Sequence, residues 1–437
     1  MRGERFVIRG DKPLAGEVAV CGSKNAATKM MVASLLTDKP CTLDNIPLSQ
    51  DVAITMELCG RVGGQVVSGT DHSCTIETRE ILNTSLTELS RRNRIPILAV
   101  GPLLHRRGEA EVPFLGGDPI GHRPIDFHLE ALANMGATVE RRAASYYVTC
   151  DRLHGAEIIL AFPSVGATET VLLAASLAEG ETVILNAAVE PEALALAEML
   201  KAMGAVISYD VQARRIDISG VARLNGVRAR VIPDRNEAVS FAAAALATGG
   251  EILIRGAEAP HLEAFLRQAR EIGGSVQWEA DGGLRAKGAA YYRPTAIETA
   301  PHPGFMTDWQ QPFSILLTKA RGTSIIHETV YEDRLGYLKD LMRMGADIAV
   351  SDECTAAPPC RFAGRTFNHS ARISGPARLR GGEMEMLDIR AGMAHVIAAL
   401  AAEGESVISG VEHIDRGYER IDERLRGLGA EIRRIAA

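Results

Sequence analysis

The feature that most constrains the fold of this chain is a short phrase that occurs six times. Each copy has a large apolar residue, Gly, a small residue, any residue, and then Val or Ile. The copies begin at Val62, Met135, Met203, Ile272, Met344 and Leu428, at intervals of 73, 68, 69, 72 and 84 residues. Most copies follow an amphipathic stretch, so we expect the glycine to end a helix in the left-handed conformation and the Val or Ile to begin a strand.

A second phrase alternates with the first at the same period. It predicts a helix of small residues that ends in a turn and leads into a strand, as in residues 33–43, 175–184, 245–254 and 398–408, with looser copies at 101–108 and 316–322. Six repeats at near-constant spacing predict a repeat architecture of βαβαββ units.

The repeats predict an α/β fold with two domains of three units each, meeting near residues 230–234. A chain of 437 residues is also too long for one ordinary core. Helical segments such as 240–247 and 393–402 are apolar on nearly all sides, which indicates buried helices. We therefore expect helices inside and sheets outside each domain.

Composition excludes several function classes. A net charge of -7 argues against non-specific nucleic-acid binding, because no basic excess is available to release counterions. Seven cysteines without a CxxC pair argue against zinc and redox motifs and favour a reducing compartment. No signal peptide or membrane span is recognisable. We expect a soluble cytoplasmic protein with no metal, cofactor, membrane, nucleic acid or obligate protein partner.

Polar and charged residues precede the first helix of each repeat. The six groups are residues 23–25, 91–94, 164–168, 234–237, 307–309 and 388–390. Helix starts favour anions, and ordinary capping by Ser or Asp is the alternative. Cations at four of the starts oppose the dipole, so a bound anion is the expected compensation. If the inner helices are parallel, Lys24, Arg94, Arg235 and Arg390 would line a phosphate-seeking pocket between the domains.

At these residues the sequence resembles the enolpyruvyl transferases, from about Phe6 to Ile435. The most specific segments are 22–27, 116–128, 163–169, 233–237, 299–308, 328–334 and 413–420. The resemblance implies a two-domain inside-out α/β barrel, in agreement with the repeats. It also implies that the first strand joins the second domain. The expected domains are 21–232, with a mobile loop around 113–122, and 1–20 plus 233–437.

The resemblance implies transfer of the enolpyruvyl group of phosphoenolpyruvate to the 3'-hydroxyl of UDP-N-acetylglucosamine, with release of phosphate. This is the first committed step of peptidoglycan synthesis. Leu115, Val239-Ser240 and Gly392 depart from the usual residues, so a paralogue acting on another nucleotide or UDP-sugar in secondary metabolism stays open. A shikimate-phosphate transferase and an inactive nucleotide-sugar sensor are further alternatives, which the segment at 123–126 and the retention of Lys24, Asp308 and Arg416 argue against.

The resemblance also assigns site residues. Lys24, Arg123 and Arg416 match phosphoenolpyruvate-holding cations, and Arg94 matches an anion-binding arginine. Acceptor contacts fall on Asn25, Arg123, Pro124, Ile125, Asp126, Phe127, Ser164, Val165, Gly166 and Val330, of which residues 164–166 would receive the diphosphate. Asp308 matches the essential aspartate beside the reacting hydroxyl, and Asp388, Arg390, Glu332 and Arg334 match polar residues of the second domain.

The chemistry implied by the resemblance needs one acid and one base. We expect Asp308 to act as the base toward the acceptor hydroxyl and Asp118 to act as the acid. Asp118 stands where most family members carry a cysteine on a mobile loop. Since fosfomycin acts by reacting with that cysteine, we expect fosfomycin resistance.

Overall fold

The computed structural model describes residues 3–89, 94–116, 125–332, 334–356 and 359–436. They divide into a first unit (residues 22–116 and 125–232) and a second unit (residues 3–21 and 233–436). The division follows Cys21, one residue later than expected. The backbone N–H of Cys21 donates to Glu237 at 2.9 Å, and its carbonyl accepts from Asp234 N–H at 2.8 Å, which ties Cys21 to the second unit.

The glycines of the recurring phrase all adopt the left-handed backbone conformation. Their φ angles are 109° at Gly63, 97° at Gly136, 109° at Gly204, 100° at Gly273, 103° at Gly345 and 92° at Gly429. Each glycine follows a helix and precedes a strand, as the phrase predicted. A side chain with a Cβ would be strained there, which explains why glycine recurs.

The elements of the first unit follow the chain from residue 24 to residue 230. They are α1 (Lys24–Ala33), η1 (Ser34–Leu36), β3 (Cys41–Asp44), α2 (Gln50–Arg61), β4 (Gln65–Ser68), β5 (Cys74–Glu77), η2 (Ile95–Ala99), α3 (Val100–Arg107), β6 (Glu109–Pro113), α4 (Asp126–Asn134), β7 (Thr138–Arg141), β8 (Ser145–Thr149), β9 (Glu157–Ile159), α5 (Val165–Ala175), β10 (Glu181–Leu185), α6 (Pro191–Ala202), β11 (Val206–Asp210), β12 (Arg215–Ser219) and β13 (Arg228–Arg230).

The second unit combines two N-terminal strands with the C-terminal half. Its elements are β1 (Glu4–Arg9), β2 (Ala15–Ala19), α7 (Arg235–Thr248), β14 (Glu251–Arg255), η3 (Ala259–His261), α8 (Glu263–Glu271), β15 (Ser275–Trp278), β16 (Leu284–Lys287), β17 (Ala296–Glu298), α9 (Thr307–Thr318), β18 (Gly322–His327), α10 (Leu338–Arg343), β19 (Asp347–Ser351), β20 (Ser370–Gly375), β21 (Glu383–Glu385), α11 (Ile389–Ala401), β22 (Glu405–Ser409), α12 (Val411–Ile414), α13 (Ile421–Gly427) and β23 (Glu431–Ala436).

The sheets repeat one strand order. In each four-stranded sheet an edge strand runs parallel to its neighbour and the next two pairings are antiparallel. These sheets are β2-β14-β16-β15, β17-β18-β20-β19, β21-β22-β1-β23, β13-β3-β5-β4 and β9-β10-β12-β11. In the sheet β6-β8-β7 an isolated parallel bridge from Ser85 to Glu111 takes the place of the edge strand. The order confirms six copies of the predicted α/β unit.

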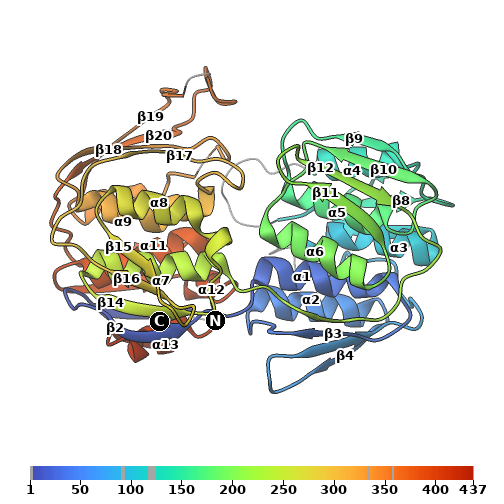
Figure 1. Cartoon of the computed structure of the whole chain (residues 1–437), viewed down its shortest axis with the longest axis horizontal. Helices are drawn as coiled ribbons and strands as arrows, with labels where there is room; N and C mark the ends of the chain where they lie inside the picture. The colour runs from blue at the N-terminus through green and yellow to red at the C-terminus, as the bar shows by residue number, and fades with distance from the viewer. Residues whose placement is uncertain (1–2, 90–93, 117–124, 333, 357–358, 437) are drawn as a thin grey trace. The chain divides into compact units, whose positions relative to one another are not determined.

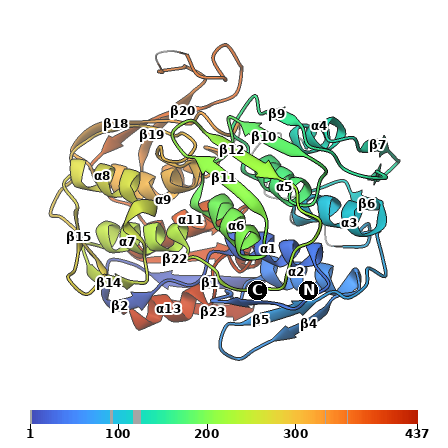
Figure 2. The same cartoon turned by 45° about the vertical axis from the view of Figure 1, so that its right-hand side comes forward.

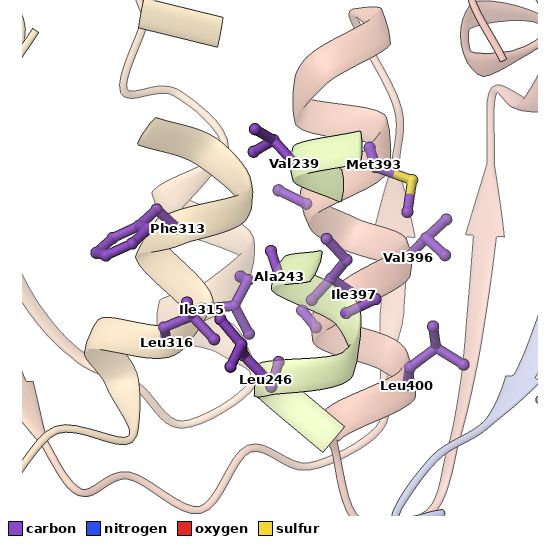
Figure 3. Close-up of a cluster of buried hydrophobic side chains, with 14 of the residues drawn as sticks. Val239, Ala243, Leu246, Phe313, Ile315, Leu316, Met393, Val396, Ile397 and Leu400 are labelled. Carbon is purple, nitrogen blue, oxygen red and sulfur yellow. The ribbon is translucent and has the colours of Figure 1, made fainter. Parts of the chain in front are cut away.

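The second unit has its core among three helices. Helices α7, α9 and α11 pack against one another, and each also packs against a sheet (Figure 1). Figure 3 shows the side chains between these helices, among them Ala243, Phe313 and Ile397. All three are fully buried, so this unit has helices inside and sheets outside, as predicted.

The first unit follows the same plan. Helix α5 is buried along nearly its whole length and packs against α3, α4 and α6, while α1 packs against α2 and α6. Sheet strands cover these helices, as β10 and β12 cover α5 (Figure 2). Across the described residues of both units, no helix is long and apolar enough to cross a membrane.

Candidate active site

The second unit holds a carboxylate between two buried guanidinium groups. Asp308 is the second residue of α9. Its Oδ1 accepts from Nη2 of Arg334 at 2.6 Å, and its Oδ2 accepts from Nε of Arg390 at 3.0 Å. The exposed fraction is 2% for the Arg334 side chain and 7% for that of Arg390, but 22% for that of Asp308. The carboxylate is therefore the accessible end of a buried charge network.

Arg390 is fixed from three sides at the start of α11. The side chain of Asp388 caps this helix and accepts from the backbone N–H of Arg390 at 2.8 Å. Nη1 of Arg390 donates to the Tyr418 hydroxyl at 2.9 Å, and that hydroxyl is 2.7 Å from Oγ of Ser240 on α7. Burial lowers the pKa of Arg390, but its interactions with Tyr418, Asp308 and Asp234 outweigh burial and raise the pKa, so the guanidinium stays positive.

Glu328 connects Asp308's helix to the turn that carries Val330. Its buried carboxylate accepts from the Thr307 hydroxyl at 2.8 Å and from the backbone N–H groups of Val330 and Tyr331 at 2.8 and 3.0 Å. Burial raises the pKa of Glu328, and Arg334 partly offsets that rise. The sequence gives no local signal for Glu328, because its partners belong to a helix start and a turn that meet only in the folded unit.

The cations at the starts of α7 and α11 have carboxylates beside them. Asp234 caps α7 through the N–H groups of Asn236 and Glu237, as Asp388 caps α11. The Arg235 guanidinium lies over the Trp309 ring at 5.7 Å and contacts His302 Nδ1 at 3.2 Å. In this unit Arg390 and Arg235, which were expected to hold a bound anion, therefore contact protein groups.

Arg416 lies in the same unit, between α12 and α13. It is buried and stands two residues before Tyr418, which contacts Arg390. The structure brings Asp308, Arg334 and Arg390 together, and Arg416 lies in the segment of Tyr418, which contacts Arg390.

In the first unit, Lys24 begins α1 and is held by a carboxylate. Its Nζ lies 2.7 Å from Oδ2 of Asp51, the second residue of α2. The exposed fractions of the two side chains are 13% and 5%. Ser23, which precedes α1, makes no side-chain cap hydrogen bond to this helix. Asn25, the second residue of α1, is half-buried. Asp51 thus offsets a cation that the helix dipole disfavours.

The start of α5 is shaped by a close approach to a histidine. Ser164 caps α5 by accepting from Ala167 N–H at 3.3 Å. A Cβ on Gly166 would lie 2.9 Å from Cε1 and 3.0 Å from Nε2 of His128, so only glycine fits without a shift. Nδ1 of His128 lies 2.7 Å from the Thr170 hydroxyl.

His128 is uncharged in this setting. Burial, and then the positive charge of Arg94, lower the pKa of His128 to about 3. The neutral ring of His128, which lies beside Gly166, adds no charge to the start of α5. His128 was not expected to have a role, although it lies in the segment at 116–128 that carries the family resemblance.

The remaining expected residues have the following places. Ile125 is buried and immediately precedes α4. Asp126 and Phe127 are the first two residues of α4. Asp118, Arg123 and Pro124, and most of the expected mobile loop at 113–122, lie outside the described residues.

One group of side chains in the second unit, which the sequence did not indicate, places four metal-ligand-type atoms close together. His327, Cys354, Cys360 and His369 place one ligand-type atom each within 4.8 Å of one another. The sequence gives no local signal for this group, because the cysteines are six positions apart in the connection between β19 and β20 and His327 lies at the end of β18.

The sequence of this chain is similar to a known protein family and to several of its named members. Residues 8–425 match the family described as EPSP synthase (3-phosphoshikimate 1-carboxyvinyltransferase). A UDP-N-acetylglucosamine 1-carboxyvinyltransferase of Protochlamydia amoebophila is 44% identical over 97% of this chain and 93% of its own length. Proteins of that name from Chlamydia pneumoniae and Caulobacter vibrioides are 45% and 40% identical, covering 96% and 99% of this chain and 92% and 98% of their own lengths.

Solved structures show the same fold at lower identity. The enolpyruvyl transferase NikO from Streptomyces tendae has a TM-score of 0.87 at 23% identity and covers 100% of both chains. EPSP synthase from Acinetobacter baumannii has a TM-score of 0.74 at 18% identity, with 99% of this chain and 100% of that chain covered. The chain therefore belongs to the EPSP synthase family, in the branch whose curated relatives are named UDP-N-acetylglucosamine 1-carboxyvinyltransferase.

Proposed function

We propose that this chain transfers the enolpyruvyl group of phosphoenolpyruvate to the 3'-hydroxyl of UDP-N-acetylglucosamine and releases phosphate, as the first committed step of peptidoglycan synthesis in the cytoplasm. The observation that carries the proposal is identity of 38–45% along nearly the whole chain to proteins of that name. The Asp308 carboxylate, which is paired with Arg334 and Arg390, supports the proposal, because the reaction needs a proton acceptor beside a sugar hydroxyl.

In the proposed reaction the acceptor oxygen bonds to C2 of phosphoenolpyruvate while C3 gains a proton. Phosphate then leaves from C2 as C3 loses a proton, which restores the double bond. Asp308 takes the hydroxyl proton. Each of its oxygens accepts an arginine hydrogen bond, and the side chain is 22% exposed, so the carboxylate is open to a hydroxyl that approaches from solvent. Arg334 and Arg390 fix the carboxylate's orientation.

The first unit is proposed to bind anionic groups. Lys24 presents an ammonium group that Asp51 orients, and residues 164–166 present backbone N–H groups at the positive end of α5. We propose that Lys24, together with Arg123 and Arg416, holds phosphoenolpyruvate and that the start of α5 receives the acceptor's diphosphate. Asn25, Arg94 and residues 125–127 are further proposed substrate contacts.

Asp118 is proposed as the acid, and this assignment predicts fosfomycin insensitivity. A thiolate opens the epoxide of fosfomycin, whereas a carboxylate is a poor nucleophile for it. We expect the wild type to stay active after incubation with fosfomycin. The Asp118→Cys variant should be active before exposure to fosfomycin and should lose activity with time of incubation. Time-dependent inactivation of the wild type, with the adduct on Asp118, would contradict this role.

The acceptor is tested by phosphate release from phosphoenolpyruvate with UDP-N-acetylglucosamine, UMP, other UDP-sugars and shikimate 3-phosphate. We expect turnover with UDP-N-acetylglucosamine to exceed that with every other acceptor. Faster turnover with another nucleotide would favour the paralogue, and no turnover with any acceptor would favour the inactive sensor.

A further inference from the structure

The cluster of His327, Cys354, Cys360 and His369 lies at one end of the sheet β17-β18-β20-β19. His327 is the last residue of β18, and His369 immediately precedes β20. The antiparallel register pairs His327 with Ser370, so the two histidines come side by side. The cysteines belong to the connection between β19 and β20, and all four ligand-type atoms lie within 4.8 Å of one another.

Each histidine has one nitrogen engaged and one without a partner. Nδ1 of His327 lies 3.2 Å from Oε2 of Glu298, and Nδ1 of His369 lies 3.1 Å from the carbonyl of Phe367. Nε2 of both rings is buried without a hydrogen-bond partner, and the residues are only 2% and 0% exposed. A carboxylate or carbonyl that accepts from Nδ1 leaves the Nε2 lone pair for a metal, as in metal-bound histidines.

The cysteine sulfurs are arranged for a metal rather than for a disulfide. Their Sγ atoms are 3.4 Å apart. A disulfide would bring them to about 2.0 Å, whereas Zn–S bonds of about 2.3 Å in a tetrahedron separate two sulfurs by about 3.8 Å. The backbone N–H of Cys360 donates to Cys354 Sγ at 3.2 Å, and that of Phe362 donates to Cys360 Sγ at 3.4 Å. Both bonds favour thiolates.

The ligand set identifies the metal. Two thiolates and two imidazoles in a tetrahedron suit zinc, and four protein ligands leave no open position for substrate. The Phe362 and Phe367 rings lie edge-on to His369, with centroids 5.9 and 6.0 Å away, and His369 is fully buried. These features are typical of a structural rather than a catalytic site.

We propose that His327, Cys354, Cys360 and His369 bind one Zn²⁺ in a closed structural site. On binding, the two thiols release their protons to solvent and two Zn–S and two Zn–N bonds form. The metal joins the β19–β20 connection to the end of β18, one residue before Glu328. Arg361 from this connection also lies 3.9 Å from Glu332. The metal thus anchors the segment beside the Val330 turn, whose role in acceptor binding rests on the proposed function.

Metal analysis of the purified full-length protein tests the site. We expect one zinc per chain in the wild type and less than a tenth of that in Cys354→Ser and Cys360→Ser. Both cysteines are partly exposed, so these variants should fold. Cys150→Ser is the matched control, because Cys150 is a partly exposed thiol of the other unit. After replacement of zinc by cobalt, thiolate-to-cobalt absorption should appear in the wild type and Cys150→Ser but not in the other two.

Several outcomes would overturn the proposal. One is wild-type protein that holds less than a tenth of an equivalent of zinc after reduction and incubation with Zn²⁺. Another is an iron or copper content of one equivalent in place of zinc. Undiminished zinc in Cys354→Ser and Cys360→Ser would place the metal elsewhere. Because zinc content does not depend on enolpyruvyl transfer, failure of this site and failure of the proposed function are distinguishable.

Discussion

The two units build the same repeats but begin their inner helices with different chemistry. In the second unit, carboxylates stand at the starts of α7, α9 and α11, at Asp234, Asp308 and Asp388. In the first unit, α1 and α5 follow Ser23 and Ser164 and have no acidic residue in their first turns. A carboxylate offsets the positive end of a helix, and a hydroxyl leaves most of that potential in place.

The difference shows how one fold provides two kinds of electrostatic setting. The first unit leaves the starts of α1 and α5 with a positive potential, to which the neutral His128 adds no charge. The second unit uses arginines to hold a carboxylate. Repeats of one architecture thus differ through the few residues at their helix starts, while the glycine caps and sheets stay alike.

Removing the carboxylate of the second unit should have the largest effect. Asp308→Asn keeps the shape but loses the proton acceptor, so we expect kcat to fall by about 10²–10⁴-fold. Binding of UDP-N-acetylglucosamine, measured by calorimetry, should change little. Asp347→Asn, at an exposed residue of the same unit, is the control. Loss of acceptor binding with a normal fold would move Asp308 from chemistry to recognition.

Removing the cation of the first unit tests its role in anion binding. Lys24→Ala should weaken phosphoenolpyruvate capture by about 2–5 kcal/mol, a typical cost for truncating a buried charge pair. The measurement is kcat/KM at low phosphoenolpyruvate, with the exposed Lys39→Ala as control.

A double variant separates binding from folding at the same place. Lys24→Ala leaves Asp51 buried with a charge, so adding Asp51→Asn should restore stability without restoring transfer. Near-normal turnover of Lys24→Ala at low phosphoenolpyruvate would contradict the assignment.

The neutral histidine of the first unit predicts a pH dependence of stability. The folded pKa of His128 is about 3, below the unfolded value of about 6.5, so the unfolded state binds one more proton between these pH values. Stability should therefore fall by about 1.4 kcal/mol per pH unit as the pH drops below 6.5. Thermal unfolding of His128→Gln should show a shallower slope than that of His154→Gln, an exposed histidine of this unit. Equal slopes would mean that His128 is charged when folded.

The caps themselves should give the smallest effects and a direct comparison. Asp388→Ala removes two hydrogen bonds to α11 and a charge beside Arg390, so we expect a loss of about 1–2 kcal/mol. Ser164→Ala removes one long bond to α5 and should cost about 0.5–1 kcal/mol. Denaturant unfolding of both variants measures the difference. A larger loss for Ser164→Ala would reverse the comparison.

Local features of this protein were determined by sequence alone. The six glycines could be predicted as helix ends, because a left-handed backbone excludes most other residues at that position. The starts of α1, α5, α7, α9 and α11 also lie where capping and charged residues were recognised. The all-apolar composition of α7 and α11 identified them as buried helices. Each of these inferences depends on residues within a few turns of one another.

Only the tertiary structure decided which distant residues meet. Arg334 and Arg390 reach Asp308 from 26 and 82 positions away, and nothing local in the chain pairs them. His128 and Gly166 likewise meet through the packing of α4 on α5. The metal-ligand cluster depends on the register of β18 and β20, which sets His327 beside His369. Sheet register is a cooperative property of the whole fold, so the sequence determined the elements and the fold assembled the chemistry.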